Sequence, residues 1–119
     1  MILNDEEYNL VESFILFPFA LAVLEKDLEK FKQVTVKYPD IYIERIEKTI
    51  IQIRKRLRDV KKELRKKNIT IYEIERVKMH SYTRLNYDIY LRGHKEQLFY
   101  FSYVINIRVK EILQKYFNY

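Results

Sequence analysis

The first third of the chain carries a regular stripe of apolar residues. The stripe repeats at steps of three and four, the spacing of one face of an α-helix, and consists of Leu10, Phe14, Phe17, Leu21, Leu24, Leu28 and Phe31. Asn4 and Glu7 have the spacing of a capping box. We therefore predict a helix over about residues 5–32. Pro18 removes one backbone hydrogen bond, but the stripe keeps its phase on both sides, so we expect a bend there and not a break.

A second stripe of the same period predicts a second helix, over about residues 40–67. Its members are Ile43, Ile46, Ile50, Ile53, Leu57, Val60 and Leu64. The two stripes mirror each other about residue 37. Folding the chain back at residues 33–39 would set Leu21 beside Ile53 and Leu10 beside Leu64. A loop of that length is ordinary between antiparallel neighbours, so the pattern predicts a helical hairpin. In that hairpin Glu7 would face Lys67 and Glu12 would face Lys62.

The last third shows a third helical stripe, which predicts a helix over about residues 95–117. The stripe consists of Leu98, Phe101, Ile105, Val109, Ile112 and Tyr116. The first helix also carries apolar residues away from its stripe, which is typical of a helix covered on more than one side. We therefore expect the first helix to be central, with the C-terminal half packed against it.

The stretch at residues 69–92 has two interpretations. Leu85, Tyr87, Ile89 and Leu91 alternate as in a strand, and Ile69 with Ile71 would pair against them as a short β-hairpin. A helix through Ile74, Val77, Leu85 and Ile89 fits as well. We favour a third helix because the rest of the chain reads as helical, with Gly93 in the turn into the last helix. The predicted fold is mainly α: one domain over residues 1–119, a small helical bundle built on an antiparallel hairpin.

Composition agrees with few turns and with a cytoplasmic protein. The 119 residues include one glycine, two prolines and no cysteine, which excludes disulfides and thiolate metal sites. The apolar run Phe14–Leu24 follows several acidic residues and no basic one, the wrong charge for a signal peptide, and it is too short to span a bilayer. We expect a cytoplasmic protein without a membrane partner.

The net charge of +6 is unevenly distributed. Residues 41–67 hold four acidic and eleven basic residues, a net of +7. A helix this basic could bind the phosphates of a nucleic acid, in a way that depends on salt but not on nucleotide sequence. The candidate phosphate contacts are Arg54, Lys55, Arg58 and Lys66. The simpler interpretation is a solvated helix face, which we favour.

Aromatic residues concentrate in the C-terminal half. Tyrosine and arginine are enriched at protein interfaces, so Tyr82, Tyr87, Tyr90 and Arg92 are candidate contacts for a partner protein. Together with Arg84 they would also suit stacking on unpaired bases. An aromatic core with hydroxyl groups at the surface is the third and simplest interpretation.

The sequence contains little that indicates a catalytic or metal-binding site. His80 and His94 lie fourteen residues apart without metal-site spacing, even when Asp88 or Glu96 is added. A single glycine cannot build a phosphate-binding loop, and no serine lies in a nucleophile elbow. We predict that the protein is not an enzyme and uses no cofactor.

One resemblance adds a family to this picture. Tyr87, Tyr90, the triplet Arg92-Gly93-His94, Tyr100, Val109 and the pair Tyr116-Phe117 resemble the YhjD-like family of small uncharacterised proteins of Bacillus and its phages. At His94 the family pattern leads us to expect a tyrosine. The resemblance implies a bacterial or phage origin and brings no activity with it. The expected function is a small non-enzymatic protein-interaction or regulatory module, and the alternative is weak, non-specific nucleic-acid binding through residues 54–67.

Overall fold

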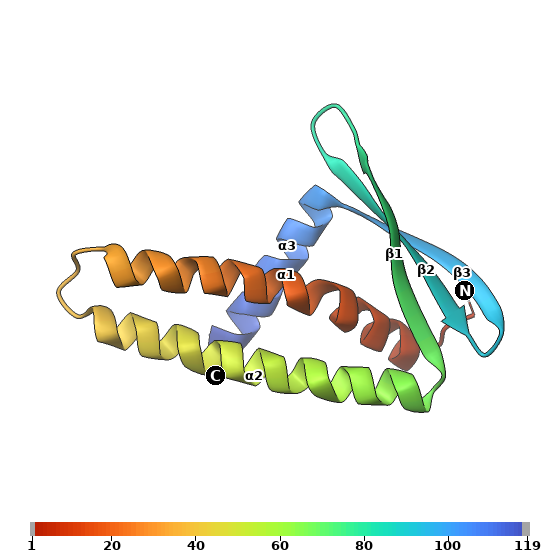
Figure 1. Ribbon diagram of the computed structural model, residues 1–119, viewed down its shortest axis with the longest axis horizontal. Helices are drawn as coiled ribbons and strands as arrows, with labels where there is room; N and C mark the ends of the chain where they lie inside the picture. The colour runs from red at the N-terminus through yellow and green to blue at the C-terminus, as the bar shows by residue number, and fades with distance from the viewer. Residues whose placement is uncertain (1, 118–119) are drawn as a thin grey trace.

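The computed structural model describes residues 2–117 and combines three helices with a three-stranded antiparallel sheet (Figure 1). The order along the chain is α1 (Asp5–Gln33), α2 (Pro39–Lys66), β1 (Ile69–Lys78), β2 (Thr83–Leu91), β3 (His94–Phe101) and α3 (Ser102–Phe117). The expectation of a small helical bundle is therefore wrong, because a sheet forms a substantial part of the fold.

The helical hairpin is confirmed, and its ends follow local rules. Asn4 accepts a hydrogen bond from the backbone N–H of Glu7, and the Glu7 carboxylate accepts one from the N–H of Asn4. This is the predicted capping box. Helix α1 continues through Pro18. Pro39 begins α2, where a missing N–H costs nothing. Asn68, with a φ of 56°, follows the end of α2 in the left-handed conformation that asparagine tolerates.

The register of the hairpin is close to the mirror pattern at both ends. Near the loop, Phe31 stacks on Tyr42 with ring centroids 5.4 Å apart. At the open end, Lys67 pairs with Glu6 at 3.7 Å, one residue from the predicted Glu7. Glu12 does not follow the pattern: its carboxylate accepts hydrogen bonds from Tyr100 and Arg108, each at 3.0 Å, instead of facing Lys62.

Residues 69–91 form the β-hairpin that the sequence left open, not the favoured third helix. Strand β1 pairs with β2 from Ile69 opposite Leu91 to Lys78 opposite Thr83, with a bulge between Glu73 and Glu75. Every second residue of β2 points into the core, and Leu85, Tyr87, Ile89 and Leu91 are all buried. Strict alternation of this kind is the signature of a strand with one covered face.

The last predicted helix, 95–117, is too long at its start. Residues 94–101 form β3, which pairs with β2 so that Leu85 lies opposite Tyr100 and Tyr87 opposite Leu98. Gly93, with a φ of 88°, and Arg92, with a φ of 46°, make the tight turn between β2 and β3. The glycine therefore leads into a strand, and the helix begins only at Ser102.

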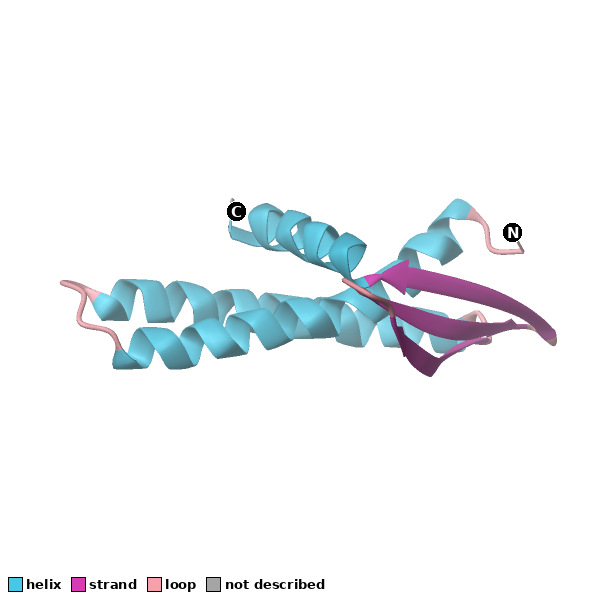
Figure 2. Cartoon of the chain, turned by 90° about the horizontal axis from the view of Figure 1, so that it is seen from above, coloured by secondary structure: helices cyan, strands magenta, loops and turns pink. Residues whose placement is uncertain are grey.

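Helix α1 is the central element, as predicted. Val11, Ile15, Leu16 and Ala20 are buried in a core that includes residues of both other helices and of the sheet. Phe17 meets Tyr116 of α3 edge to face, with ring centroids 6.2 Å apart. Figure 1 shows α3 crossing the hairpin, and Figure 2 shows α3 on one side of the hairpin and the sheet beside the hairpin's open end. The sheet therefore has one face toward the helices and leaves the other face available for contacts.

Candidate functional site

The face of the sheet that points away from the core is rich in aromatic side chains. We define the outer sheet face by six residues with side chains on this side: Tyr72, Ile74, Arg84, Asp88, Tyr90 and Phe99. The side chains of Tyr72 and Phe99 are both 54% exposed. Scattered surface apolar residues need no explanation, but a cluster of aromatic residues on one face is typical of an interaction site.

Ring contacts hold these side chains in fixed positions. Tyr72 on β1 meets Tyr90 on β2 edge to face, with centroids 5.8 Å apart. The Arg84 guanidinium lies over the ring of Phe99 at 5.8 Å. Phe99 meets Phe101 at 5.3 Å, and Phe101 in turn contacts Tyr82 at 5.2 Å. Side chains that are already ordered lose little entropy when a partner covers them.

A cavity of about 270 Å³ lies in the middle of this face. Its lining includes Ile74, Glu75, Arg84, Asn86, Asp88 and Phe99. Asp88 is 7% exposed, and one of its carboxylate oxygens is 3.4 Å from Lys95. Its other oxygen, and the Nε of Arg84, are buried without a hydrogen-bond partner among the described residues. These two buried polar atoms belong to side chains that line the cavity, and they lack the hydrogen-bond partners that buried polar atoms normally have.

The structure divides the predicted interface residues between this face and the interior. Tyr90 belongs to the outer sheet face, and Tyr82 packs on the adjoining ring of Phe101. Tyr87 points inward, is 6% exposed and meets Tyr100 edge to face. Burial raises the pKa of the Tyr87 hydroxyl to about 12. Tyr87 is therefore a core residue that a partner does not reach.

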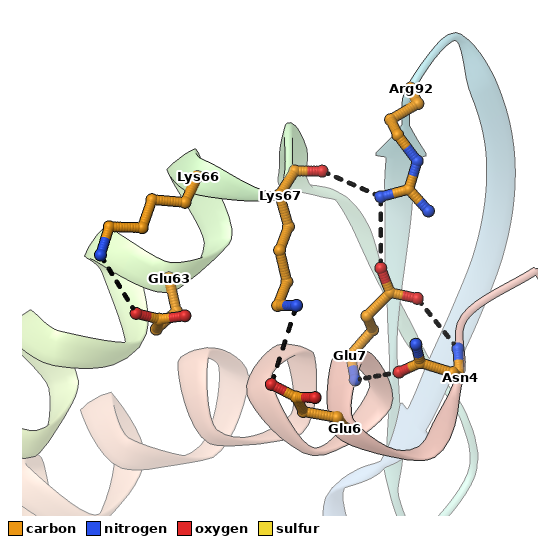
Figure 3. Close-up of polar contacts among 7 residues, drawn as sticks. All are labelled: Asn4, Glu6, Glu7, Glu63, Lys66, Lys67 and Arg92. Carbon is orange, nitrogen blue, oxygen red and sulfur yellow. Dashed lines mark hydrogen bonds and ion pairs between the residues drawn. The ribbon is translucent and has the colours of Figure 1, made fainter.

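Arg92 belongs to a polar network that joins three parts of the fold (Figure 3). Its guanidinium donates to the Glu7 carboxylate at 3.3 Å and to the backbone carbonyl of Lys67 at 3.2 Å. The hydrogen bond from the backbone N–H of Asn4 lowers the pKa of Glu7, and Arg92 and Lys67 add to this effect. The network ties the start of α1 to the end of α2 and to the β2–β3 turn, so the place of Arg92 is structural.

Acidic neighbours neutralise part of the positive charge of α2. Arg54 pairs with Glu25 of α1 at 2.8 Å, and Lys66 pairs with Glu63 at 3.6 Å. Lys55 and Arg58 are exposed, and neither forms an ion pair with another residue in the described range 2–117. Two of the four predicted phosphate contacts therefore already have an acidic neighbour.

Tyr72 and Asp88 were missed as members of the interface. Their shared position follows from strand register, because Tyr72 lies opposite Asp88 and Asn86 lies opposite Phe99. The signal was present in the alternation of β2, where Asn86, Asp88 and Tyr90 fall between the buried residues. It could be used only once the stretch was known to be a strand.

A metal-binding cluster or a helix long enough to cross a membrane would also indicate a function. Among residues 2–117, no three or more His, Cys, Asp or Glu side chains are grouped to hold a metal ion. Helix α1 is long and apolar enough to cross a membrane by length and composition, a test that the core helix of a soluble protein also passes. Here its apolar residues pack against α2, α3 and the sheet.

Comparison with known proteins gives one family and one relative. A family model described as YhjD protein matches residues 2–119. The chain is 32% identical over 114 residues to a protein of Bacillus subtilis (strain 168) named "Uncharacterized protein YhjD". That alignment covers 96% of this chain and 92% of the relative. No solved structure matches the chain.

Proposed function

The chain belongs to the YhjD family, and we propose that it is a small non-enzymatic protein-interaction or regulatory module that binds a partner protein through its outer sheet face. The resemblance first seen in the C-terminal third extends over nearly the whole chain. The relative's name assigns no activity. The proposal therefore depends on the surface of this protein.

The observation that carries the proposal is the combination of exposed rings and unpartnered buried polar atoms on one face. Tyr72, Tyr90 and Phe99 supply apolar area, and Arg84 and Asp88 supply a donor and an acceptor beside it. Protein interfaces are enriched in aromatic residues and arginine, and their hot spots lie in desolvated pockets. A partner side chain or backbone group that offers both a donor and an acceptor would fit the cavity.

The charges of this face favour a protein over a nucleic acid. Arg84 and Lys95 are accompanied by Glu75 and Asp88, so the positive charges are balanced by negative ones. A surface that binds a phosphate backbone carries an excess of positive charge. Mixed charge around exposed rings is typical of protein partners.

Site-specific crosslinking in Bacillus cells, the genus of the relative, tests the proposal. A photoreactive benzoylphenylalanine replaces Tyr72 in one variant and Ile51 in the control, because Ile51 is at least as exposed but lies on α2. We expect a discrete protein adduct from position 72, lost when Phe99→Ala and Tyr90→Ala are added, and none from position 51. Equal adducts from both positions, or an adduct removed by nuclease, would contradict it.

The second candidate is weak nucleic-acid binding through α2, which the exposure of Lys55 and Arg58 favours. Since Arg54 and Lys66 have acidic neighbours, about two phosphate contacts remain, and the log–log salt slope should be near −2. A mobility-shift titration of the wild type beside a Lys55→Gln, Arg58→Gln variant measures this slope. A shift that persists at 200 mM salt with one preferred sequence would place this candidate first.

A further inference from the structure

The loop between α1 and α2, together with the first turn of α2, carries a second group of exposed apolar side chains. Within residues 34–42, Val34, Val36, Tyr38, Ile41 and Tyr42 are all exposed, with Ile41 at 63% and Tyr38 at 58%. We call these five residues the hairpin tip. Tyr42 stacks on Phe31, but the other four residues are not part of the core or packed against it.

The hairpin tip lies at the opposite end of the molecule from the sheet. The molecule measures 55 Å along its longest axis, and Figures 1 and 2 both show the α1–α2 loop at one end of this axis and the sheet near the other. Helix α3 crosses the hairpin well short of the loop. The tip is therefore convex and protruding, and contacts made there leave the outer sheet face uncovered.

Basic residues lie on and beside the hairpin tip. Residues 29–42 hold Lys30, Lys32 and Lys37 against Glu29 and Asp40, which leaves a net charge of +1. Lys32 pairs with Glu29 at 3.6 Å, an exposed contact of little strength. The Lys37 ammonium group lies 5.5 Å from the centre of the Tyr38 ring. Apolar side chains, tyrosine hydroxyls and ammonium groups thus share one small surface.

We propose that the hairpin tip docks on an anionic membrane surface. Stable surface attachment needs two contributions, apolar side chains that enter the headgroup region and basic residues attracted to anionic lipids. The tip supplies both, and tyrosine prefers the membrane–water interface. A convex loop offers little of the concave or flat area that a specific protein interface requires. This proposal replaces the expectation, drawn from the sequence, of a protein without a membrane partner. The attachment concerns the surface of a bilayer only, and it is independent of the partner proposed for the sheet.

The absence of tryptophan from the chain makes the test direct. A Tyr38→Trp variant places one fluorophore at the tip, and an Ile51→Trp control places one at an equally exposed site in the middle of α2. We expect the emission of Tyr38→Trp to shift to the blue with vesicles of phosphatidylglycerol and phosphatidylcholine. It should not shift with phosphatidylcholine alone, and Ile51→Trp should shift with neither.

Co-sedimentation with the same vesicles separates the two contributions. Val36→Ser with Tyr38→Ser should abolish binding to the anionic vesicles. Lys30→Gln with Lys37→Gln should weaken it about 25-fold, from about a fivefold effect for each lysine near an anionic surface. The matched control, Lys55→Gln with Arg58→Gln, should bind as the wild type does. Absence of binding at low salt, equal binding to neutral vesicles, or an equal shift at position 51 would each overturn the proposal.

Discussion

Glu7 shows how one side chain can serve several elements at once. It completes the cap of α1, accepts a hydrogen bond from Arg92 beside the β2–β3 turn, and lies near Lys67 at the end of α2. The sequence predicted the cap, because a capping box is local, and the mirrored stripes predicted the proximity of Lys67. The contact with Arg92 joins residues 85 positions apart, and such a pairing cannot be read from spacing.

Replacing Glu7 with Gln should lower stability at neutral pH and leave it nearly unchanged in acid. The contacts above lower the pKa of Glu7, so the folded state favours the carboxylate. That contribution is complete above the pKa of an unfolded glutamate and is lost as the pH falls through the lower folded value. Urea denaturation midpoints at pH 7 and pH 3 measure the difference.

The control for this experiment is Glu29→Gln, a change at an exposed residue near the end of α1. It should shift the midpoint very little at either pH, because exposed ion pairs contribute little. A Glu7→Gln effect of the same size at both pH values would show that the ionised form contributes no stability.

At the scale of elements, the helical hairpin was predictable because one long period decides it. The stripes of α1 and α2 extend over about six turns each, and no strand of that length is compatible with steps of three and four. In α2 the predicted stripe residues Ile46, Ile50, Ile53, Leu57, Val60 and Leu64 are all buried. The cap at Asn4 and the proline at the start of α2 fixed the ends of the helices almost to the residue.

Shortening a buried residue of this stripe should cost far more than shortening its exposed neighbour. Ile53 is fully buried between the helices, whereas Ile51 is 65% exposed on the same turn. We expect Ile53→Ala to lower the free energy of unfolding by about 2–5 kcal/mol and Ile51→Ala to change it by less than about 0.5 kcal/mol. Equilibrium urea denaturation of both variants checks this, and equal effects would contradict the observed packing.

The sheet was harder to predict because its segments are short and fit two periods. Leu98, Phe101 and Ile105 follow helical spacing, although Leu98 and Phe101 lie in β3 and Ile105 lies in α3. Leu98 pairs with Tyr87 of β2 and therefore belongs to a strand. Strand propensity depends strongly on such neighbours across the sheet, which the sequence alone does not give. The candidate interface could not be predicted without the strands, because Tyr72, Asp88 and Phe99 share a face only in that register.

Replacing the glycine in the turn between β2 and β3 should lower the stability of the protein. Gly93 has a φ of 88°, and an added Cβ would meet no atom within 4 Å. The cost of Gly93→Ala is then one of backbone conformation alone, about 1–2 kcal/mol for a left-handed residue. Thermal denaturation should show a smaller loss for Gly93→Asn, because asparagine tolerates this conformation. Equal stability of the alanine variant would mean that the turn adopts another form.

At the scale of the whole molecule, the exposed apolar residues gather mainly at the two ends of the long axis. One group is the outer sheet face and the other is the hairpin tip. Between them, α1 links the two ends through a single buried cluster that contains residues of all three helices and of the sheet. This arrangement allows one end to be occupied without covering the other.

The same continuous core predicts that helices and sheet unfold together. Leu24 and Ile53 of the hairpin, and Ile89 of the sheet, are all at most 1% exposed in one cluster. The sheet has no second core of its own, and a small sheet is not stable without packing on one face.

Urea unfolding followed by helical circular dichroism and by the near-ultraviolet signal of the eleven tyrosines should therefore give coincident transitions. Ile89→Ala should move both midpoints by the same amount, because the change removes packing that both parts share. Loss of the tyrosine signal while the helical signal persisted would contradict a single cooperative transition.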